Sequence, residues 1–237
     1  MLTACSSTLP YYAQAEVVRT FRHDGAAWTQ GLVFDGPTLY ECTGLHGESS
    51  LRRVDLETGK ALQTRQLPDG YFGEGCTIWN DHIIQLTWHA GVGIVYDKET
   101  FAIQRQFDYE GEGWGLTHDR SRLIMSDGTS HLRFLDPETL EETGRVQVLE
   151  DDEPVERLNE LEWIRGQVWA NVWQTSRIVR VDPDTGQVLG WVDCSAIAER
   201  EPGGVLNGIA ARGREILVTG KRWNAIYQVE IAPAESQ

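Results

Sequence analysis

Four polar residues of this chain could carry acid–base chemistry and bind a substrate by hydrogen bonds. Glu74 can accept and return a proton, and Gln30, Asn159 and Lys221 can donate hydrogen bonds. Nine tryptophans in 237 residues are more than a core of this size usually needs. Flat apolar walls around a few polar groups are typical of a ligand site. Each residue alone could equally be a core or surface residue, so the fold must bring them together.

An alternating strand pattern ends five times in an acidic residue, at positions 55, 97, 136, 182 and 230. These positions lie 39 to 48 residues apart, and one propeller blade takes about 40–50 residues. The first four are followed by Asp-x-x-Thr turns, in which the Asp side chain can accept backbone N–H groups. The repeat therefore predicts an all-β protein, a five-bladed β-propeller with four-stranded antiparallel blades.

The last repeat contains only three clear strands, at residues 206–212, 215–220 and 225–231. Residues 15–21, near the N-terminus, form a strand pattern with no repeat of their own. We expect this strand to join the last blade and close the ring, because closure removes exposed sheet edges. Residues 15–237 would then be a single domain, with residues 1–14 a leader remnant or tether.

In a propeller, the first strand of each blade starts at the mouth where the second strand ends. The predicted starts carry Gln30, Glu74, Trp114, Asn159 and Asn207, and the predicted ends carry Thr43, Trp88, Asp127, Trp173 and Lys221. A lectin usually repeats its site in every blade, whereas these positions differ from blade to blade. The sequence therefore predicts one asymmetric site at this mouth.

Charge and hydropathy exclude several classes of partner. The net charge of −15 argues against nucleic acid, because phosphate binding is driven by Lys and Arg. The same charge disfavours an anionic membrane surface. No apolar run approaches 18 residues, so we expect no transmembrane segment.

The four cysteines have no C-x-x-C spacing, so the sequence does not indicate a zinc site. We expect Cys42, Cys76 and Cys194 to be small core residues. Cys5 differs, because residues 2–5 (LTAC) resemble a bacterial lipoprotein cleavage box without the leader that should precede it. The match is either coincidental or indicates an exported protein, periplasmic or secreted, with a possible lipid anchor at Cys5.

Nine motifs resemble, in order, those of the plant and bacterial type of glutaminyl-peptide cyclotransferase (glutaminyl cyclase), over residues 28–223. They are TQGL (29–32), YFGEG (71–75), QLTW (85–88), GWGLT (113–117), SDG (126–128), LNELEW (158–163), WANVWQ (169–174), LNGI (206–209) and VTGK (218–221). Each motif alone is weak evidence for the family, and the resemblance is specific because all nine occur in the same order. The family is a five-bladed propeller that converts an N-terminal glutamine to pyroglutamate and releases ammonia.

The resemblance implies a role for each matching residue. Glu74 is the catalytic acid–base group. Gln30, Asn159 and Lys221 contact the substrate, and the aromatic walls are Trp28, Phe72, Trp88, Trp114 and Trp173. Trp28 stands where the family usually has Phe. No metal or cofactor is expected, the partners are peptides with N-terminal glutamine, and we expect a monomer.

Two other functions fit the same residues. A carbohydrate- or protein-binding propeller without catalysis would also use a tryptophan-rich mouth. A propeller glycoside hydrolase would need paired carboxylates, which Glu74, Asp127 and Glu160 could supply.

Overall fold

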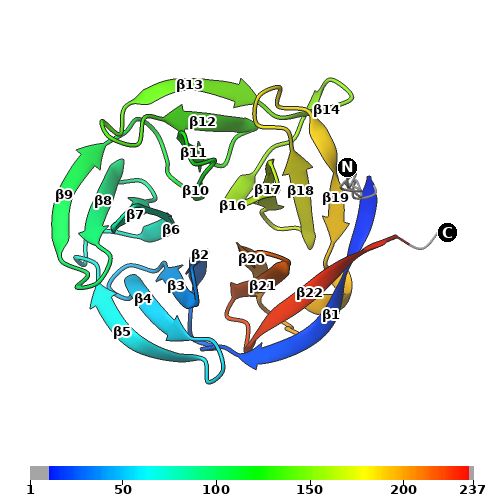
Figure 1. Cartoon of the computed structure of the whole chain (residues 1–237), viewed down its shortest axis with the longest axis horizontal. Helices are drawn as coiled ribbons and strands as arrows, with labels where there is room; N and C mark the ends of the chain where they lie inside the picture. The colour runs from blue at the N-terminus through cyan, green and yellow to red at the C-terminus, as the bar shows by residue number, and fades with distance from the viewer. Residues whose placement is uncertain (1–10, 235–237) are drawn as a thin grey trace, which may run out of the picture.

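The computed structural model describes residues 11–234, and its regular secondary structure is almost entirely β-strand (Figure 1). The strand patterns of the sequence are the cause, since Val, Ile, Leu and aromatic residues alternate with polar ones between glycine-containing turns. One short helix, α1 (Ser195–Ala198), occurs within this part of the chain. No described helix is long and apolar enough to cross a membrane. Cys5 and its proposed lipid anchor lie outside the described residues.

Three sheets have four antiparallel strands each, in sequence order. The first contains β2 (Thr29–Asp35), β3 (Thr38–Thr43), β4 (Ser50–Asp55) and β5 (Lys60–Gln66). The second contains β6 (Gly73–Trp79), β7 (His82–Thr87), β8 (Val92–Asp97) and β9 (Ile103–Asp108). The third contains β10 (Leu116–His118), β11 (Leu123–Ser126), β12 (His131–Leu135) and β13 (Glu142–Gln147).

The fourth sheet has eight strands and consists of two such units joined through β1 (Tyr12–Arg22). One unit is β16 (Leu158–Ile164), β17 (Gln167–Val172), β18 (Arg177–Val181) and β19 (Val188–Asp193). The other is β20 (Val205–Arg212), β21 (Glu215–Lys221), β22 (Ala225–Pro233) and β1 itself. A short hairpin, β14 (Leu149–Glu150) and β15 (Glu153–Pro154), precedes β16.

The strand near the N-terminus pairs with the last strand of the described chain, as the sequence predicts. β1 is antiparallel to β22 over most of its length. Its first residues, 12–14, also pair in parallel with β19, so the strand begins before the expected boundary at residue 15. β1 therefore connects the β16–β19 unit to the β20–β22 unit through backbone pairing.

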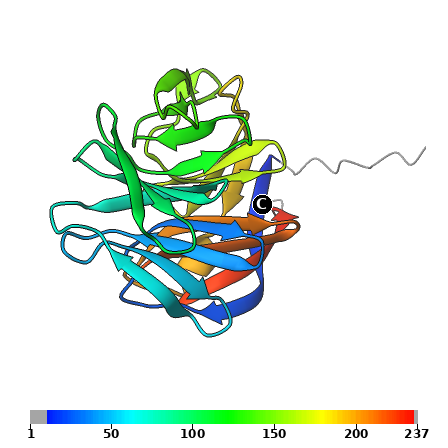
Figure 2. The same cartoon turned by 60° about the vertical axis from the view of Figure 1, so that its left-hand side comes forward.

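The innermost strands contact one another in the cyclic order β2, β6, β10, β16, β20 and back to β2 (Figure 1). The turned view shows each sheet twisted as it runs outward from this inner ring (Figure 2). The hydrophobic core lies between adjacent sheets. For example, Tyr40 and Leu51 of the first sheet belong to the same buried cluster as Ile83 and Tyr96 of the second.

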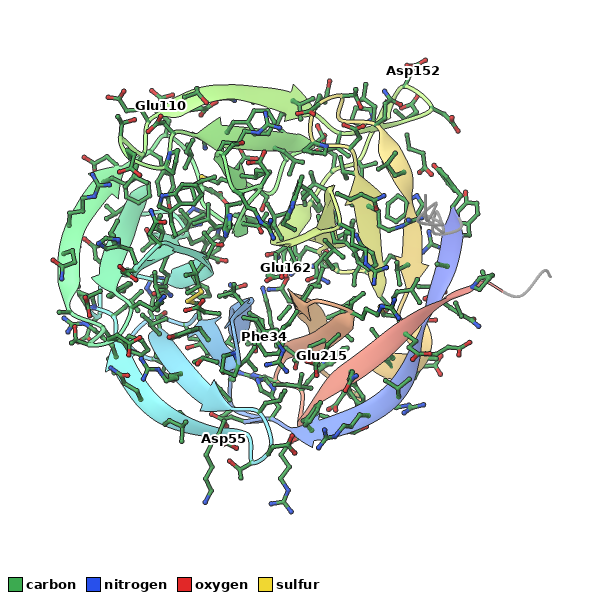
Figure 3. All side chains as sticks on the ribbon, in the orientation of Figure 1. Phe34, Asp55, Glu110, Asp152, Glu162 and Glu215 are labelled. Atoms are coloured by element: carbon green, nitrogen blue, oxygen red, sulfur yellow. A yellow bond between two sulfur atoms is a disulfide. The ribbon has the colours of Figure 1, made fainter. Side chains whose placement is uncertain are left out.

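The predicted Asp-x-x-Thr turns are confirmed. In each, the Asp Oδ1 atom accepts the backbone N–H of the Thr three residues later, at 2.7–3.1 Å. The pairs are Asp55–Thr58, Asp97–Thr100, Asp136–Thr139 and Asp182–Thr185. Figure 3 shows Asp55 at the edge of the ring, whereas Glu162 points to its middle. The repeated turns are thus structural and lie away from the inner strands.

Cys42 and Cys76 are core residues, as expected, and they also form a disulfide with each other, which the sequence did not indicate. Both are buried, at 0% and 2% exposure, so the predicted burial is correct. Cys42 is on β3 and Cys76 is on β6, and these strands of neighbouring sheets contact each other. Nothing in their spacing along the chain shows this juxtaposition. Cys194 remains a buried free thiol.

We expect loss of this disulfide to lower the free energy of unfolding by about 3–4 kcal/mol, because the bond closes a loop of 34 residues. Urea unfolding of the wild type with and without dithiothreitol measures the effect. The Cys42→Ala/Cys76→Ala variant is the control, since reductant should not change its stability further. The prediction would be contradicted if the wild type had the same unfolding midpoint with and without dithiothreitol.

Candidate active site

β-Bulges place the candidate site residues at the middle of the ring. The pairing register shifts in four of the five inner strands, namely between Thr29 and Gly31 in β2, between Gly73 and Cys76 in β6, and correspondingly in β16 and β20. The residues within these shifts include Gln30, Glu74, Asn159 and Asn207. A bulge releases a residue from the ladder and turns its side chain. The bulges therefore aim these four polar groups away from the sheets.

Glycines next to these residues allow the inner strands to approach one another. The N–H of Gly75 donates to the carbonyl of Trp114 at 2.7 Å, and a Cβ on Gly75 would lie 2.6 Å from that oxygen. A Cβ on Gly115 would lie 2.1 Å from the carbonyl oxygen of Asn159. Glycine is thus required directly after Glu74 and directly after Trp114, because the inner strands pack closely at these two positions.

One cavity of about 220 Å³ is lined by every residue to which the family resemblance assigns a role. Its lining residues are Trp28, Gln30, Leu45, Phe72, Glu74, Trp88, Trp114, Asn159, Trp173 and Lys221. Leu45 is the addition that the sequence did not predict. It lies just after β3 with a φ of 85°, and no motif marked it. The geometry places these side chains together, and their chemical roles remain predictions.

Glu74 is the only carboxylate among the lining residues of this cavity, and it is 5% exposed. Burial raises the pKa of Glu74 well above its ordinary value. The positive charge of Lys221 opposes this effect, and the negative charge of Glu112 adds to it. A carboxyl whose pKa is shifted toward neutrality is suited to accept and release a proton.

A chain of two amide hydrogen bonds holds Glu74 in place. The Asn207 Nδ2 donates to Gln30 Oε1 at 3.1 Å, and Gln30 Nε2 donates to Glu74 Oε1 at 2.8 Å. The carbonyl end of Gln30 therefore faces Asn207, and its NH₂ end faces the acid. Gln30 thus orients Glu74 in addition to lining the cavity.

Lys221 and Asn159 keep polar atoms available for a ligand. Lys221 is 4% exposed, and burial lowers its pKa although the charge of Glu74 partly offsets this. Its Nζ lies 5.7 Å from the centre of the Trp28 ring. Asn159 Oδ1 is buried without a hydrogen-bond partner among residues 11–234. A buried polar atom without a partner is costly unless a bound molecule supplies one.

Aromatic side chains form the walls in two edge-to-face pairs. Phe72 and Trp88 have ring centres 5.5 Å apart, and Trp114 and Trp173 have ring centres 5.4 Å apart with an interplanar angle of 88°. Such pairs fix each other's orientation. The cavity therefore has rigid aromatic walls around a small number of polar groups.

Comparison with known proteins identifies the family. A family model described as glutamine cyclotransferase matches residues 2–231.

The chain belongs to the glutamine cyclotransferase family.

The resemblance found in the motifs is thus confirmed. A glutaminyl-peptide cyclotransferase of Arabidopsis thaliana is 40% identical over 234 residues, covering 94% of this chain and 73% of that protein. The crystal structure of the Myxococcus xanthus glutaminyl cyclase is similar with a TM-score of 0.89 at 34% sequence identity. That match covers 95% of this chain and 100% of the other.

The paired carboxylates that a glycoside hydrolase needs are not found in the cavity of this cyclotransferase family member. Asp127 and Glu160 do not line it. Glu160 instead accepts the backbone N–H groups of Leu32 and Ile209, at 3.2 and 2.8 Å, and so ties β16 to β2 and β20. Among the described residues, no three His, Cys, Asp or Glu side chains are grouped as a metal site.

Proposed function

We propose that this protein is a glutaminyl-peptide cyclotransferase, which converts the N-terminal glutamine of peptides to pyroglutamate and releases ammonia. The observation that carries the proposal is Glu74, a single buried carboxyl oriented by Gln30 inside a tryptophan-walled cavity. The family and both relatives agree with this activity.

The first task of such a site is to fold the glutamine side chain so that its α-amine reaches its own γ-carboxamide carbon. Positioning of this kind can remove about 7–11 kcal/mol of a barrier when the geometry is right. Rigid walls formed by Trp88, Trp114 and Trp173 favour a compact ring-like conformer. The same walls exclude water, which would otherwise compete with the amine as nucleophile.

Glu74 carries the proton in this proposal. The neutral α-amine forms a C–N bond to the carbonyl carbon of the γ-carboxamide, and the carboxylate of Glu74 accepts the proton that the nitrogen loses. Glu74 then returns this proton to the departing NH₂ group, which leaves as ammonia when the original C–N bond breaks. One carboxylate thereby serves as base and then as acid.

The negative oxygen of the tetrahedral intermediate needs hydrogen-bond donors. We assign this role to Lys221 Nζ and the side-chain amide of Asn159, because both groups line the cavity with Glu74. Donors that are held in place before the reaction cost little reorganisation when charge develops.

For Lys221→Ala we expect kcat/KM to fall roughly 10²-fold, because the variant loses one oxyanion donor. The loss should be shared between KM and kcat, since Lys221 would contact the substrate as well as the intermediate. Steady-state ammonia release gives both constants. Arg222→Ala is the control, because Arg222 lies over the same Trp28 ring, with its Cζ 5.2 Å from the ring centre, but is not among the cavity-lining residues. A Lys221→Ala variant with wild-type constants would contradict the assignment.

The activity itself is tested with a Gln-peptide and with Gln-β-naphthylamide, by measuring ammonia and the pyroglutamyl product. The matched control is the same peptide with an acetylated α-amine, which cannot attack. We expect product from the free amine alone. No ammonia from either peptide would overturn the proposal, and ammonia from the acetylated peptide would indicate an amidase that uses water.

We further propose that the five four-stranded units are the blades of a propeller and that residues 15–237 form one domain. The cyclic contacts of the inner strands support this. An exported location, periplasmic or secreted, is supported by the Cys42–Cys76 disulfide, because disulfides persist mainly in oxidising compartments.

A further inference from the structure

Glu112 lies behind the cavity walls and contacts two of them through one atom. Its Oε2 accepts the indole N–H of Trp88 at 2.6 Å and that of Trp114 at 2.8 Å. Trp88 follows β7 of the second sheet, and Trp114 precedes β10 of the third. One carboxylate oxygen therefore joins walls that come from two neighbouring sheets.

The other oxygen of Glu112 is also engaged. Its Oε1 lies 3.2 Å from His89 Nδ1, and the His89 ring stacks on Trp88 with a centre-to-centre distance of 3.7 Å. The side chain of Glu112 is 37% exposed, which places it between the cavity and solvent. Neighbours on three sides thus fix its orientation.

Hydrogen bonds to indoles are not required by this fold in general. Trp169 Nε1 and Trp223 Nε1 are buried without a partner among residues 11–234, although both rings are almost fully buried. The two tryptophans that share Glu112 both line the cavity. Hydrogen bonds to an ionised acceptor are roughly twice as strong as neutral ones. The Trp88 and Trp114 rings are therefore held more firmly than the buried Trp169 and Trp223 rings, which lack such a bond within the described part of the chain.

We propose that Glu112 is a positioning residue of the cyclisation reaction, which sets the angle between the Trp88 and Trp114 walls and so the conformer of the bound glutamine. The inference rests on the proposed function. Glu112 does not line the cavity, so it acts through the two indoles. Displacement of a substrate by about 1 Å can cost about 10²-fold in rate.

The carboxylate of Glu112 has a second effect that can be separated from the first. Its negative charge adds to the raised pKa of Glu74. The other charged or titratable groups near Glu74 are Lys221, which opposes the shift, and Tyr109, whose own pKa is raised in part by Glu74. Removal of the Glu112 charge should therefore lower the pKa of Glu74.

Two substitutions distinguish the contacts from the charge. Glu112→Gln keeps an oxygen that can accept both indole N–H groups, and it removes the charge. We expect KM within about twofold of the wild type, with the acidic limb of the kcat/KM profile moved to lower pH. Glu112→Ala removes contacts and charge, and we expect a loss of about 10–10² in kcat/KM with changed tryptophan fluorescence.

Glu110→Gln is the matched control, because it removes the same charge from an exposed position two residues away. It should leave KM, the pH profile and the fluorescence unchanged. Wild-type constants and fluorescence in Glu112→Ala would overturn the proposal, as would an equal loss in Glu112→Gln and Glu112→Ala. If Glu112→Ala did not fold, Glu112→Gln and Glu112→Asp would give the same comparison, since Asp is too short to reach both indoles. If the wild type did not cyclise glutamine, the proposed function would fail, and the fluorescence comparison would still test whether Glu112 holds the walls.

Discussion

The Glu74→Gln variant is expected to fold normally and to cyclise N-terminal glutamine about 10²–10⁴ times more slowly than the wild type. Glutamine has the shape of glutamate, and its side-chain oxygen can still accept the hydrogen bond from Gln30 Nε2. It cannot accept a proton from the attacking amine or return one to the leaving nitrogen. The loss should therefore appear in kcat, with a smaller change in KM.

The pH dependence of the wild type follows from the same group. Burial raises the pKa of Glu74, and the proposed base is its ionised form. Consequently kcat/KM should fall as the pH drops through this raised pKa, at a higher pH than for an ordinary carboxyl near 4.3. The residual activity of Glu74→Gln should not show this fall in kcat/KM at low pH.

Glu162→Gln is the matched control for both measurements. Glu162 is another buried inner-strand carboxyl, and burial raises its pKa to about 8. It accepts the N–H of Ala211 at 2.8 Å and does not line the cavity. Below its pKa it is neutral, as glutamine is, so this variant should keep its activity. A Glu74→Gln enzyme within tenfold of the wild type would show that Glu74 is not the proton carrier.

The parts of this protein that could be predicted from sequence are those that recur with the repeat. The Asp55, Asp97, Asp136 and Asp182 turns mark equivalent points of successive units. Counting from them locates the starts of inner strands, and so Gln30, Glu74 and Asn159. The site could be predicted because equivalent positions of successive units lie at the same end of the ring, whatever residues occupy them.

Contacts that occur at only one place in the ring, and are not repeated from unit to unit, were not predicted. Glu112 lies in the connection from β9 to β10, and the equivalent position before β6 is occupied by Phe72, so comparison between repeats does not mark an acid there. The Cys42–Cys76 bond depends on how β3 faces β6 across two sheets. Strand patterns specify which side chains point inward, but they do not specify which residue of the next sheet each one meets.

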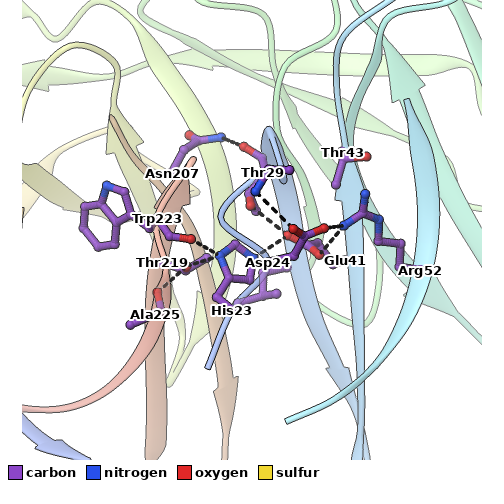
Figure 4. Close-up of polar contacts among 12 residues, drawn as sticks. His23, Asp24, Thr29, Glu41, Thr43, Arg52, Asn207, Thr219, Trp223 and Ala225 are labelled. Atoms are coloured by element: carbon purple, nitrogen blue, oxygen red, sulfur yellow. Dashed lines mark hydrogen bonds and ion pairs between the residues drawn. The ribbon is translucent and has the colours of Figure 1, made fainter. Parts of the chain in front are cut away.

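A buried ionic network at the closure of the ring is a further contact of this kind. His23 follows β1, and its Nδ1 lies 2.8 Å from the backbone oxygen of Trp223 while its Nε2 lies 2.8 Å from Glu41 Oε1 (Figure 4). Both partners are acceptors, so both ring nitrogens donate and the imidazole is positively charged. Thr29 Oγ1 donates to the same Glu41 oxygen at 2.8 Å. Arg52 Nη1 lies 3.7 Å from the other Glu41 oxygen.

The His23–Glu41 pair shifts both pKa values in favour of the charged forms. Burial alone would lower the pKa of His23, and the charge and hydrogen bond of Glu41, with smaller help from the Trp223 backbone oxygen and Asp24, outweigh it, so that this pKa is raised. Burial alone would raise the pKa of Glu41, and His23, Arg52 and Thr29 together outweigh it, so that this pKa is lowered. The pair thus contributes its full stability between the ordinary pKa values of the two groups, roughly pH 4.3 to 6.5. That contribution is lost as the pH falls through the lowered pKa of Glu41 or rises through the raised pKa of His23.

We expect His23→Ala to lower the free energy of unfolding by about 3–5 kcal/mol near pH 6, because it leaves Glu41 buried without its main counter-charge. The difference from the wild type should shrink at high pH, where His23 loses its proton in both the folded and unfolded wild-type protein. Urea unfolding at pH 6 and pH 10 measures this. His82→Ala is the control, since His82 is exposed and its loss should change stability by less than about 0.5 kcal/mol. A His23→Ala protein as stable as the wild type at pH 6 would mean that strand pairing of β1 with β19 and β22 closes the ring without help from this network.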